Sequence, residues 1–294
     1  MTELSADPAC AWCDGRLVAF AEARVPLEDR GLQFGESLYE VIAVARGEPF
    51  RLSDHVERMR SGAGEIGLAE GVPSLSEWGA IVAELHRHQP HASAILYAQV
   101  TGGTAPRSHV PQPPPRPLFF AYLRRFAFPS ADAAARGIAA VTFAEQRWQR
   151  RDLKTVMLLP AVLARKEALA RGAEEAIFVG QDGFVNEGAA SNVFAVLGRA
   201  VTTLPAGQRN LAGISGRVVE EICRKAGIPF SVRPLTVSDL RKADELFVAS
   251  TTALVMPVVR LDDVPVGGGS PGRVTLLLAQ SFRDMLWGPA GPPS

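Results

Sequence analysis

Four lysines are the residues whose amines could bond covalently to a carbonyl compound. Lys166, Lys225 and Lys242 each follow an arginine in segments with helical periodicity, which is typical of a solvated helix face. Lys154 instead lies at a junction between a predicted strand and a predicted helix, where side chains face a cleft. We therefore single out Lys154 as the candidate reactive residue.

The proton on such a lysine decides its chemistry. An ammonium group cannot attack a carbonyl carbon, so the amine has to be available in its neutral form. Burial and neighbouring cations both favour the neutral amine, and arginines are frequent in residues 147–151. These residues allow a Schiff-base lysine at 154, but by themselves they do not distinguish it from an ordinary structural lysine.

The elements that must position Lys154 can be predicted from hydrophobic periodicity. In the first part of the chain, Ser53 is expected to cap one helix and Ser76 a second, and residues 106–117 form a proline-rich loop. The expected strands are 15–21, 37–44, 93–101 and 118–124, and the expected helices are 54–66 and the segment around 78–85.

The pattern changes after residue 132, and Gly172 and Gly227 are expected to end two helices. The expected strands are 138–143, 176–179, 184–185, 193–196, 201–204, 245–250 and 255–259, and the expected helices are 158–171, 214–226 and 274–286. We predict an α/β (α+β) protein with an N-terminal domain at 1–126, a linker at 127–132, a C-terminal domain at 133–287 and a flexible tail at 288–294.

Composition limits the classes of partner. Lys+Arg and Asp+Glu are both 31, so the net charge of zero gives no reason to propose nucleic acid or a membrane as partner. No secretory signal and no run of about 18 apolar residues is present, so a cytoplasmic protein is expected.

Cys10 and Cys13 form a C-x-x-C without further ligands nearby, so we interpret them as incidental thiols and expect no metal site.

Six motifs in a fixed order carry a resemblance to a known family. They are residues 29–40, 55–58, 151–154, 186–194, 213–215 and 244–252. Together they resemble the fold-type IV pyridoxal-phosphate enzymes, a group of D-amino acid aminotransferases, branched-chain aminotransferases and aminodeoxychorismate lyases. The resemblance runs from about residue 12 to residue 285. It implies a small N-terminal α/β domain, a larger C-terminal pseudo-barrel domain and a homodimer with the active site near the interface.

The resemblance also implies which residues hold the cofactor, pyridoxal 5′-phosphate. Lys154 would form the Schiff base and move a proton, and Glu187 would accept the N–H of the pyridine ring. Arg58 would bind the phosphate bidentately with support from His55. The N–H groups at the start of a helix would complete the phosphate site. The remaining expected cofactor contacts are Leu211, Ile214, Ser215, Ser250 and Thr251.

Arg107-x-His109 bears on the substrate. It resembles the pair that binds the substrate carboxylate in D-amino acid aminotransferases together with a tyrosine, here Tyr39. Thr252 is a further expected substrate contact. Whether the proline-rich loop completes the site of a partner subunit stays open. The implied activity is transfer of an amino group from a D-alanine-type amino acid to 2-oxoglutarate.

The sequence departs from the pattern of the D-amino acid aminotransferases at three places, so other activities stay open. Gly102 stands where the D-enzymes carry a basic residue, and Ala189 and Ala190 replace small hydroxyl residues near Glu187. Residues 254–258 are similar to the lyases. The alternatives are an aminodeoxychorismate lyase that eliminates pyruvate, a branched-chain L-amino acid aminotransferase, and a non-catalytic protein that binds the cofactor.

Overall fold

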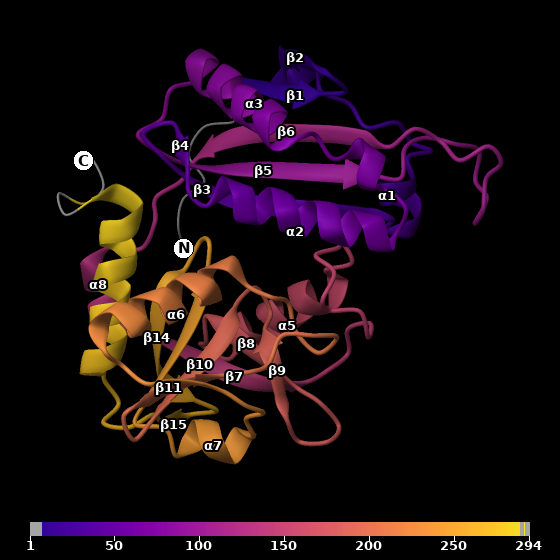
Figure 1. Cartoon of the computed structure of the whole chain (residues 1–294). Helices are drawn as coiled ribbons and strands as arrows, with labels where there is room; N and C mark the ends of the chain where they lie inside the picture. The colour runs from indigo at the N-terminus through magenta and orange to yellow at the C-terminus, as the bar shows by residue number, and fades with distance from the viewer. Residues whose placement is uncertain (1–7, 289–290, 292–294) are drawn as a thin grey trace. The chain divides into compact units, whose positions relative to one another are not determined.

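The protein is described by a computed structural model that covers residues 8–288 and 291. The chain forms two compact units (Figure 1). One holds the described residues up to Ala127 together with Leu153–Met157, and the other holds Phe128–Asp152 and the rest of the described chain from Leu158. The predicted α/β (α+β) class is confirmed, because each unit combines one sheet with helices.

The sheet of the first unit has six strands in the order β2-β1-β6-β5-β3-β4, and every neighbouring pair is antiparallel. The long central pairing joins β3 to β5, with Tyr39 opposite Gln99. The strands are β1 (Cys10–Cys13), β2 (Arg16–Ala19), β3 (Ser37–Ala45), β4 (Glu48–Pro49), β5 (Ser93–Thr101) and β6 (Leu118–Arg125).

Helices cover one face of this sheet. Helix α2 packs on β3 and α3 packs on β1 and β6, which buries alternate strand residues such as Leu38, Leu96 and Leu123. The opposite face carries half-buried aromatic residues, including Tyr39 and Tyr97. The helical elements are η1 (Phe20–Glu22), α1 (Arg30–Phe34), α2 (Leu52–Glu65), η2 (Ala69–Gly71) and α3 (Leu75–His88).

Both predicted caps in this unit were wrong. Helix α2 begins before Ser53, because Arg51 adopts a left-handed conformation at φ 58° and turns the chain into the helix without a side-chain cap. Helix α3 is capped by Ser74, not Ser76, since the Ser74 hydroxyl accepts from the N–H of Glu77 and the Glu77 carboxylate accepts from the N–H of Ser74.

The sheet of the second unit is mixed, in the order β12-β11-β10-β13-β14-β7-β8-β9, with β15 paired to β14. Parallel pairs join β7 to β8 and β14, and β11 to β12. The strands are β7 (Ile138–Ala144), β8 (Glu175–Val179), β9 (Val185–Gly188), β10 (Asn192–Leu197), β11 (Ala200–Thr203), β12 (Phe230–Val232), β13 (Glu245–Ser250), β14 (Leu254–Leu261) and β15 (Val264–Pro265).

Helices α6 and α8 pack on β13 and on each other, and α5 packs on β7 and β8. Gly227 ends α6 in a left-handed conformation, as predicted. Ala131 and Asp132, expected in the linker, form the first turn of α4, which Ser130 caps. The helices are α4 (Ala131–Arg136), α5 (Leu159–Ala170), α6 (Ile214–Ala226), α7 (Val237–Arg241) and α8 (Arg273–Trp287).

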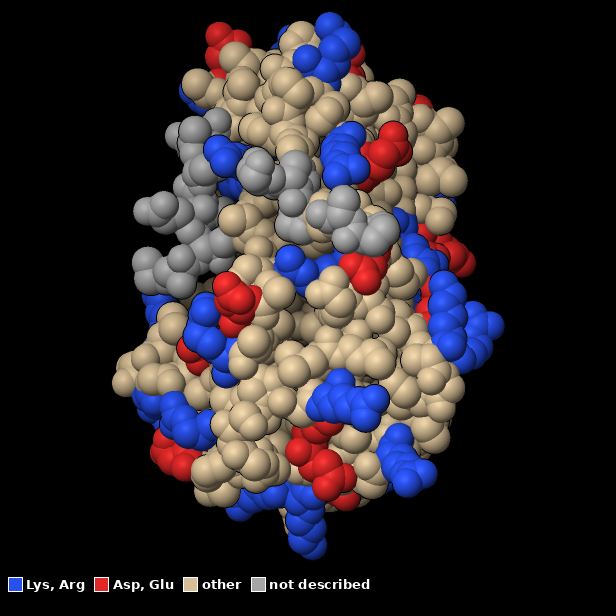
Figure 2. Space-filling model, turned by 90° about the vertical axis from the view of Figure 1, so that its left-hand side faces the viewer, with Lys and Arg blue, Asp and Glu red and all other residues tan. Residues whose placement is uncertain are grey.

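The surface carries charges of both signs. On the face drawn in Figure 2, lysine and arginine side chains lie among aspartate and glutamate side chains. Across the described part of the chain, each helix is too short or too polar to cross a bilayer. Of the expected flexible tail at 288–294, residues 289–290 and 292–294 lie outside the described residues.

Candidate active site

Lys154 lies in an extended segment that pairs with the first strand residues of β3. The N–H of Tyr39 donates to the carbonyl of Lys154 at 3.0 Å, and the N–H of Val156 donates to the carbonyl of Ser37 at 3.3 Å. Leu38 and Thr155 form an antiparallel bridge between these two hydrogen bonds. The main chain of the predicted reactive lysine is therefore fixed to the edge of the first sheet, which the sequence did not predict.

The Lys154 amine lies over an aromatic surface. Its Nζ is 4.5 Å from the centre of the Tyr39 ring. The Tyr39 ring stacks on Tyr97 at 5.8 Å, and Tyr97 stacks on Tyr122 at 5.3 Å. An aromatic face attracts a cation that lies over it. The lysine is half-buried and stands on the side of β3 opposite to α2.

Arg58 and His55 both bind Glu40, which the sequence interpretation gave no role. Glu40 is fully buried on β3. Its Oε1 accepts from Arg58 Nε and its Oε2 from Arg58 Nη2, each at 2.7 Å, and Oε2 is also 2.7 Å from His55 Nδ1. His55 thus reaches Arg58 through the carboxylate of Glu40. This side-on pairing fixes the plane of the guanidinium, which suits a group that has to bind a phosphate in one orientation.

Burial and two neighbouring side chains shift the pKa of Glu40 in opposite directions. Burial by itself raises the pKa of this carboxyl, but Arg58 and His55 lower the pKa to about 2. Burial lowers the pKa of His55 below its ordinary value, more than Glu40 raises it. Glu40 is therefore an anion at neutral pH, and it fixes the orientation of both side chains.

Glu187 lies on β9 in the second unit and is held at both oxygens. Oε1 accepts from Arg147 Nη1 at 2.6 Å, and Oε2 accepts from the N–H of Leu211 at 3.0 Å. Arg147 also binds Glu145 through Nε and Nη2. These carboxylates raise the pKa of Arg147 against the opposing effect of burial, so Arg147 stays a cation. Arg147 thus places a permanent cation beside Glu187.

The start of α6 is built around Asn192. The Nδ2 of Asn192 donates to the carbonyl of Leu211 at 3.1 Å, and Asn192 Oδ1 lies 1.7 Å from where a Cβ at Gly213 would stand. A side chain at 213 would therefore displace the Asn192 amide. Among the described residues no side chain caps α6, and the N–H groups of Ile214 and Ser215 donate to none of them although both residues are buried.

Ser250, Thr251 and Thr252 lie at the turn between β13 and β14. Ala249, the residue before Ser250, pairs with Asn192 in the sheet, so this turn and the start of α6 lie in one part of the second unit. The Ser250 hydroxyl accepts from the N–H of Ala253 at 3.1 Å. The structure thus brings Leu211, Ile214, Ser215 and Ser250 together around Asn192.

Arg107 and His109 lie in the loop between β5 and β6 and are exposed. They contact α1, since Arg107 lies 4.6 Å from the centre of the Phe34 ring and the His109 ring lies 5.5 Å from it. Within the described chain, no hydrogen bond or ring contact joins either residue to Tyr39. The three expected carboxylate ligands are therefore not assembled in a single chain.

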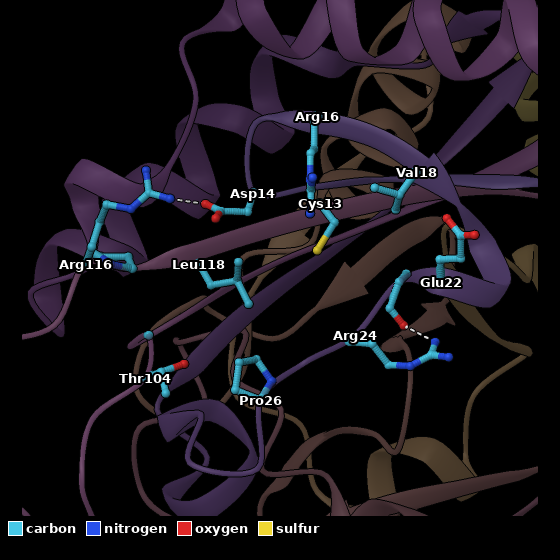
Figure 3. A pocket seen from close by; sticks show the side chains of 13 residues that line it. Cys13, Asp14, Arg16, Val18, Glu22, Arg24, Pro26, Thr104, Arg116 and Leu118 are labelled. Carbon is cyan, nitrogen blue, oxygen red and sulfur yellow. Dashed lines mark hydrogen bonds and ion pairs between the residues drawn. The ribbon is translucent and has the colours of Figure 1, made fainter.

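Cys10 and Cys13 lie on β1, where residues three apart point to opposite faces. Both are free thiols. Cys13 lines a cavity of about 490 Å³ in the first unit, with Arg24, Thr104 and Arg116 among its other walls (Figure 3). Arg116 forms an ion pair with Asp14 there. None of the predicted site residues lines this cavity.

The arrangement fits pyridoxal phosphate on two independent observations. The uncapped, buried start of α6 offers free N–H groups and a positive helix end, which suit a phosphate. Glu187 is an oriented carboxylate next to a permanent cation, which suits an acceptor for a protonated ring nitrogen. Together with Lys154 and Arg58, these groups match what the cofactor needs from a protein.

Comparison with known proteins gives the family. Residues 37–261 match the family model described as amino-transferase class IV. The chain is a class IV aminotransferase. It is therefore an enzyme of the fold-type IV group, and its cofactor is pyridoxal phosphate.

The similarity to known relatives extends over almost the whole chain. The D-alanine aminotransferase of Staphylococcus epidermidis is 36% identical over 274 residues, covering 93% of this chain and 96% of that protein. The D-alanine aminotransferase of Staphylococcus haemolyticus is 38% identical over the same shares. Among solved structures, the branched-chain aminotransferase of the archaeon Thermoproteus uzoniensis with norvaline is 26% identical, with a TM-score of 0.85 over 95% of each chain.

Replacing Glu40 with glutamine is expected to weaken cofactor binding. The neutral amide cannot accept all the hydrogen bonds that now fix Arg58 and His55, so Arg58 loses its orientation. We expect the dissociation constant for pyridoxal phosphate to rise roughly tenfold, as for loss of one charge-assisted hydrogen bond. Titration of the cofactor-free protein measures it. Glu84→Gln, which breaks the exposed pair with Arg87, is the matched control. Equal affinities for Glu40→Gln and the wild type would contradict the assignment.

The lowered pKa of Glu40 also predicts that the free energy of unfolding depends on pH in the acid range. Its pKa is lowered in the folded protein to about 2, so its contribution is complete above its unfolded pKa of about 4.3 and is lost as the pH falls towards 2. The free energy of unfolding is measured by urea denaturation at several pH values. The wild type should lose stability through this window, and Glu40→Gln should lose less. Parallel curves for the two proteins would show that Glu40 is not the group responsible.

Proposed function

We propose that this class IV aminotransferase is a D-amino acid aminotransferase that moves the amino group of a D-alanine-type donor to 2-oxoglutarate. The observation that carries the proposal is its similarity to D-alanine aminotransferases at 36–38% identity over 93% of the chain. The solved branched-chain enzymes are less similar in sequence, at 24–26% identity. Arg107 and His109 add a chemical reason, because a cation and an imidazole suit a carboxylate.

The proposed chemistry gives each of the cofactor-site residues a role. Lys154 would hold the cofactor covalently until the substrate amine takes its place, and the freed Nζ would then take the proton from the substrate Cα. When bound, pyridoxal phosphate supplies an electron-withdrawing ring that stabilises negative charge at that carbon. Glu187, paired with Arg147, would keep the ring nitrogen protonated. The same Lys154 amine would deliver the proton to the cofactor side, and hydrolysis by water would then release the 2-oxo acid and end the first half of the transfer.

The phosphate would be bound by Arg58 and by the N–H groups of Ile214 and Ser215. Glu40 supports Arg58 in this role, and Asn192 supports the start of α6. Ser250 and Thr251 would add donors from the turn after β13. Because fixing the phosphate fixes the ring, these contacts would decide which face of the cofactor ring is turned towards Lys154.

Substrate specificity would come from the carboxylate ligands. Tyr39 lies beside the Lys154 amine, so it is well placed to bind the group next to the reacting Cα. Arg107 and His109 would bind the same carboxylate, with Thr252 as a further contact. A fixed carboxylate orients the Cα–H bond, and this selects D-amino acids over their L-isomers.

We also propose a homodimer. Helix α5 buries only the alanines Ala161, Ala164 and Ala168 on its inner face. The exposed side carries four large apolar side chains, Leu159, Val162, Leu163 and Leu169, together with the charged Lys166 and Glu167. A helix whose large apolar side chains point outward needs a partner surface. The fold-type IV resemblance supports a second copy of the chain as that partner.

The proposal is tested by adding D-alanine or L-leucine to the loaded enzyme and following the visible absorbance of the cofactor. D-alanine should convert the absorbance to that of the aminated cofactor, and L-leucine should not. Arg107→Ala and His109→Ala should each raise the D-alanine concentration that gives half-maximal conversion of the absorbance roughly tenfold, because a charge-assisted hydrogen bond is lost. Arg116→Ala, in the same loop, should not.

The other outcomes are informative. A response to L-leucine alone would contradict the carboxylate interpretation and favour the branched-chain activity of the solved relatives. A loaded protein that responds to neither amino acid would contradict the proposed donor and favour the lyase alternative. Release of pyruvate from aminodeoxychorismate would then identify that reaction.

A further inference from the structure

We infer that Arg30 is a positioning residue for substrate recognition, because it holds the main chain of the loop that carries Arg107 and His109. The inference rests on the proposed function, in which those two side chains bind the substrate carboxylate. It assigns a role to α1, which otherwise contributes no residue to the site. All the contacts that carry it lie within the first unit.

Arg30 binds two successive carbonyl groups of the loop. Its Nη1 donates to the carbonyl of Ser108 at 2.6 Å and its Nη2 donates to the carbonyl of His109 at 3.0 Å. The Arg30 side chain is only 7% exposed, so these charge-assisted hydrogen bonds are largely shielded from water. Because a planar guanidinium binds both oxygens at once, it fixes the two peptide groups on either side of the His109 Cα.

The side chains of the loop rest on the same helix. The Phe34 ring has the Arg30 guanidinium 4.9 Å from its centre and the Arg107 guanidinium at 4.6 Å. The His109 ring lies 5.5 Å from it. Arg107 Nη1 also donates to Gln33 Oε1 at 3.3 Å. One turn of helix therefore sets the position of both proposed carboxylate ligands.

Glu36 orients Arg30 and explains the glycine at 102. The Arg30 Nε donates to the Glu36 carboxylate. A Cβ at Gly102 would stand 2.6 Å from Glu36 Oε2 and 3.2 Å from Arg30 Cβ, so a side chain there would displace the carboxylate from Arg30.

The helix that carries Arg30 is itself fixed. The buried Asp29 caps α1 by accepting from the N–H of Gly31 at 2.8 Å, and it accepts from the Thr101 hydroxyl at 2.6 Å. The N–H of Arg30 donates to the carbonyl of Gly103 at 2.8 Å. The base of the loop and the start of the helix are thus tied together, and Arg30 transmits this fixed geometry to Ser108 and His109.

The test compares Arg30→Met with Arg60→Met in the loaded enzyme. Arg60 is the matched control, since it also donates to two successive carbonyls, those of Val72 and Pro73. Arg30→Met should raise the KM for D-alanine roughly tenfold or more with little change in kcat, because the carboxylate ligands are misplaced. Trypsin should also cleave after Arg107 faster than in the wild type, as detected by mass spectrometry. Arg60→Met should change neither.

A second set of variants keeps the test valid if Arg30→Met fails to fold. Gly102→Ala pushes Glu36 away from Arg30 and should raise the KM for D-alanine in the same direction. In the Glu36→Ala background the added methyl group has room, so Gly102→Ala should then have little further effect. Equal effects of Gly102→Ala in both backgrounds would overturn the assigned coupling.

The two readouts separate this inference from the proposed function. If the wild type does not use D-alanine, the proposed function fails, yet the tryptic cleavage after Arg107 still tests whether Arg30 holds the loop. Unchanged cleavage in Arg30→Met would overturn the inference. Faster cleavage with an unchanged KM would overturn its link to substrate recognition.

Discussion

One main-chain hydrogen bond, from the N–H of Tyr39 to the carbonyl of Lys154, holds the main chain of the proposed Schiff-base lysine. It belongs to a short extended pairing that takes residues 153–157 away from the second unit and adds them to the first. Because Tyr39 and Glu40 are neighbours on β3, the same strand presents a ring to Lys154 on one face and a carboxylate to Arg58 on the other. Lys154 and Arg58, the proposed phosphate ligand, thus share one rigid support.

The charged groups of the site are held by buried partners of opposite charge. Glu40 holds Arg58, and Arg147 holds Glu187. A buried pair of this kind adds little to stability in comparison with apolar packing, and removing one member is costly. Its value here is orientation, since each functional group keeps its charge and its direction before any ligand arrives. Arg30 extends the same principle to the loop that carries Arg107 and His109.

The sequence predicted what depends on local pattern. The 214–226 helix and its final Gly227 follow from amphipathic periodicity and the conformational freedom of glycine. The pairing of 153–157 with β3 joins segments more than a hundred residues apart, and nothing local indicates it. Glu40 and Asn192 stood within the motifs that gave the resemblance, but their role depends on partners that only the folded chain brings to them. The roles of Arg107 and His109 stay a prediction, since neither contacts Tyr39.

The most direct test of the account is to reduce the loaded enzyme with borohydride and locate the cofactor by mass spectrometry of its peptides. Reduction turns a Schiff base into a stable amine, and the chain offers four lysines to distinguish. The account predicts that the reduced cofactor is found on Lys154 alone and that Lys154→Arg carries none. Label on Lys166, Lys225 or Lys242, or reduced protein without any label, would contradict it.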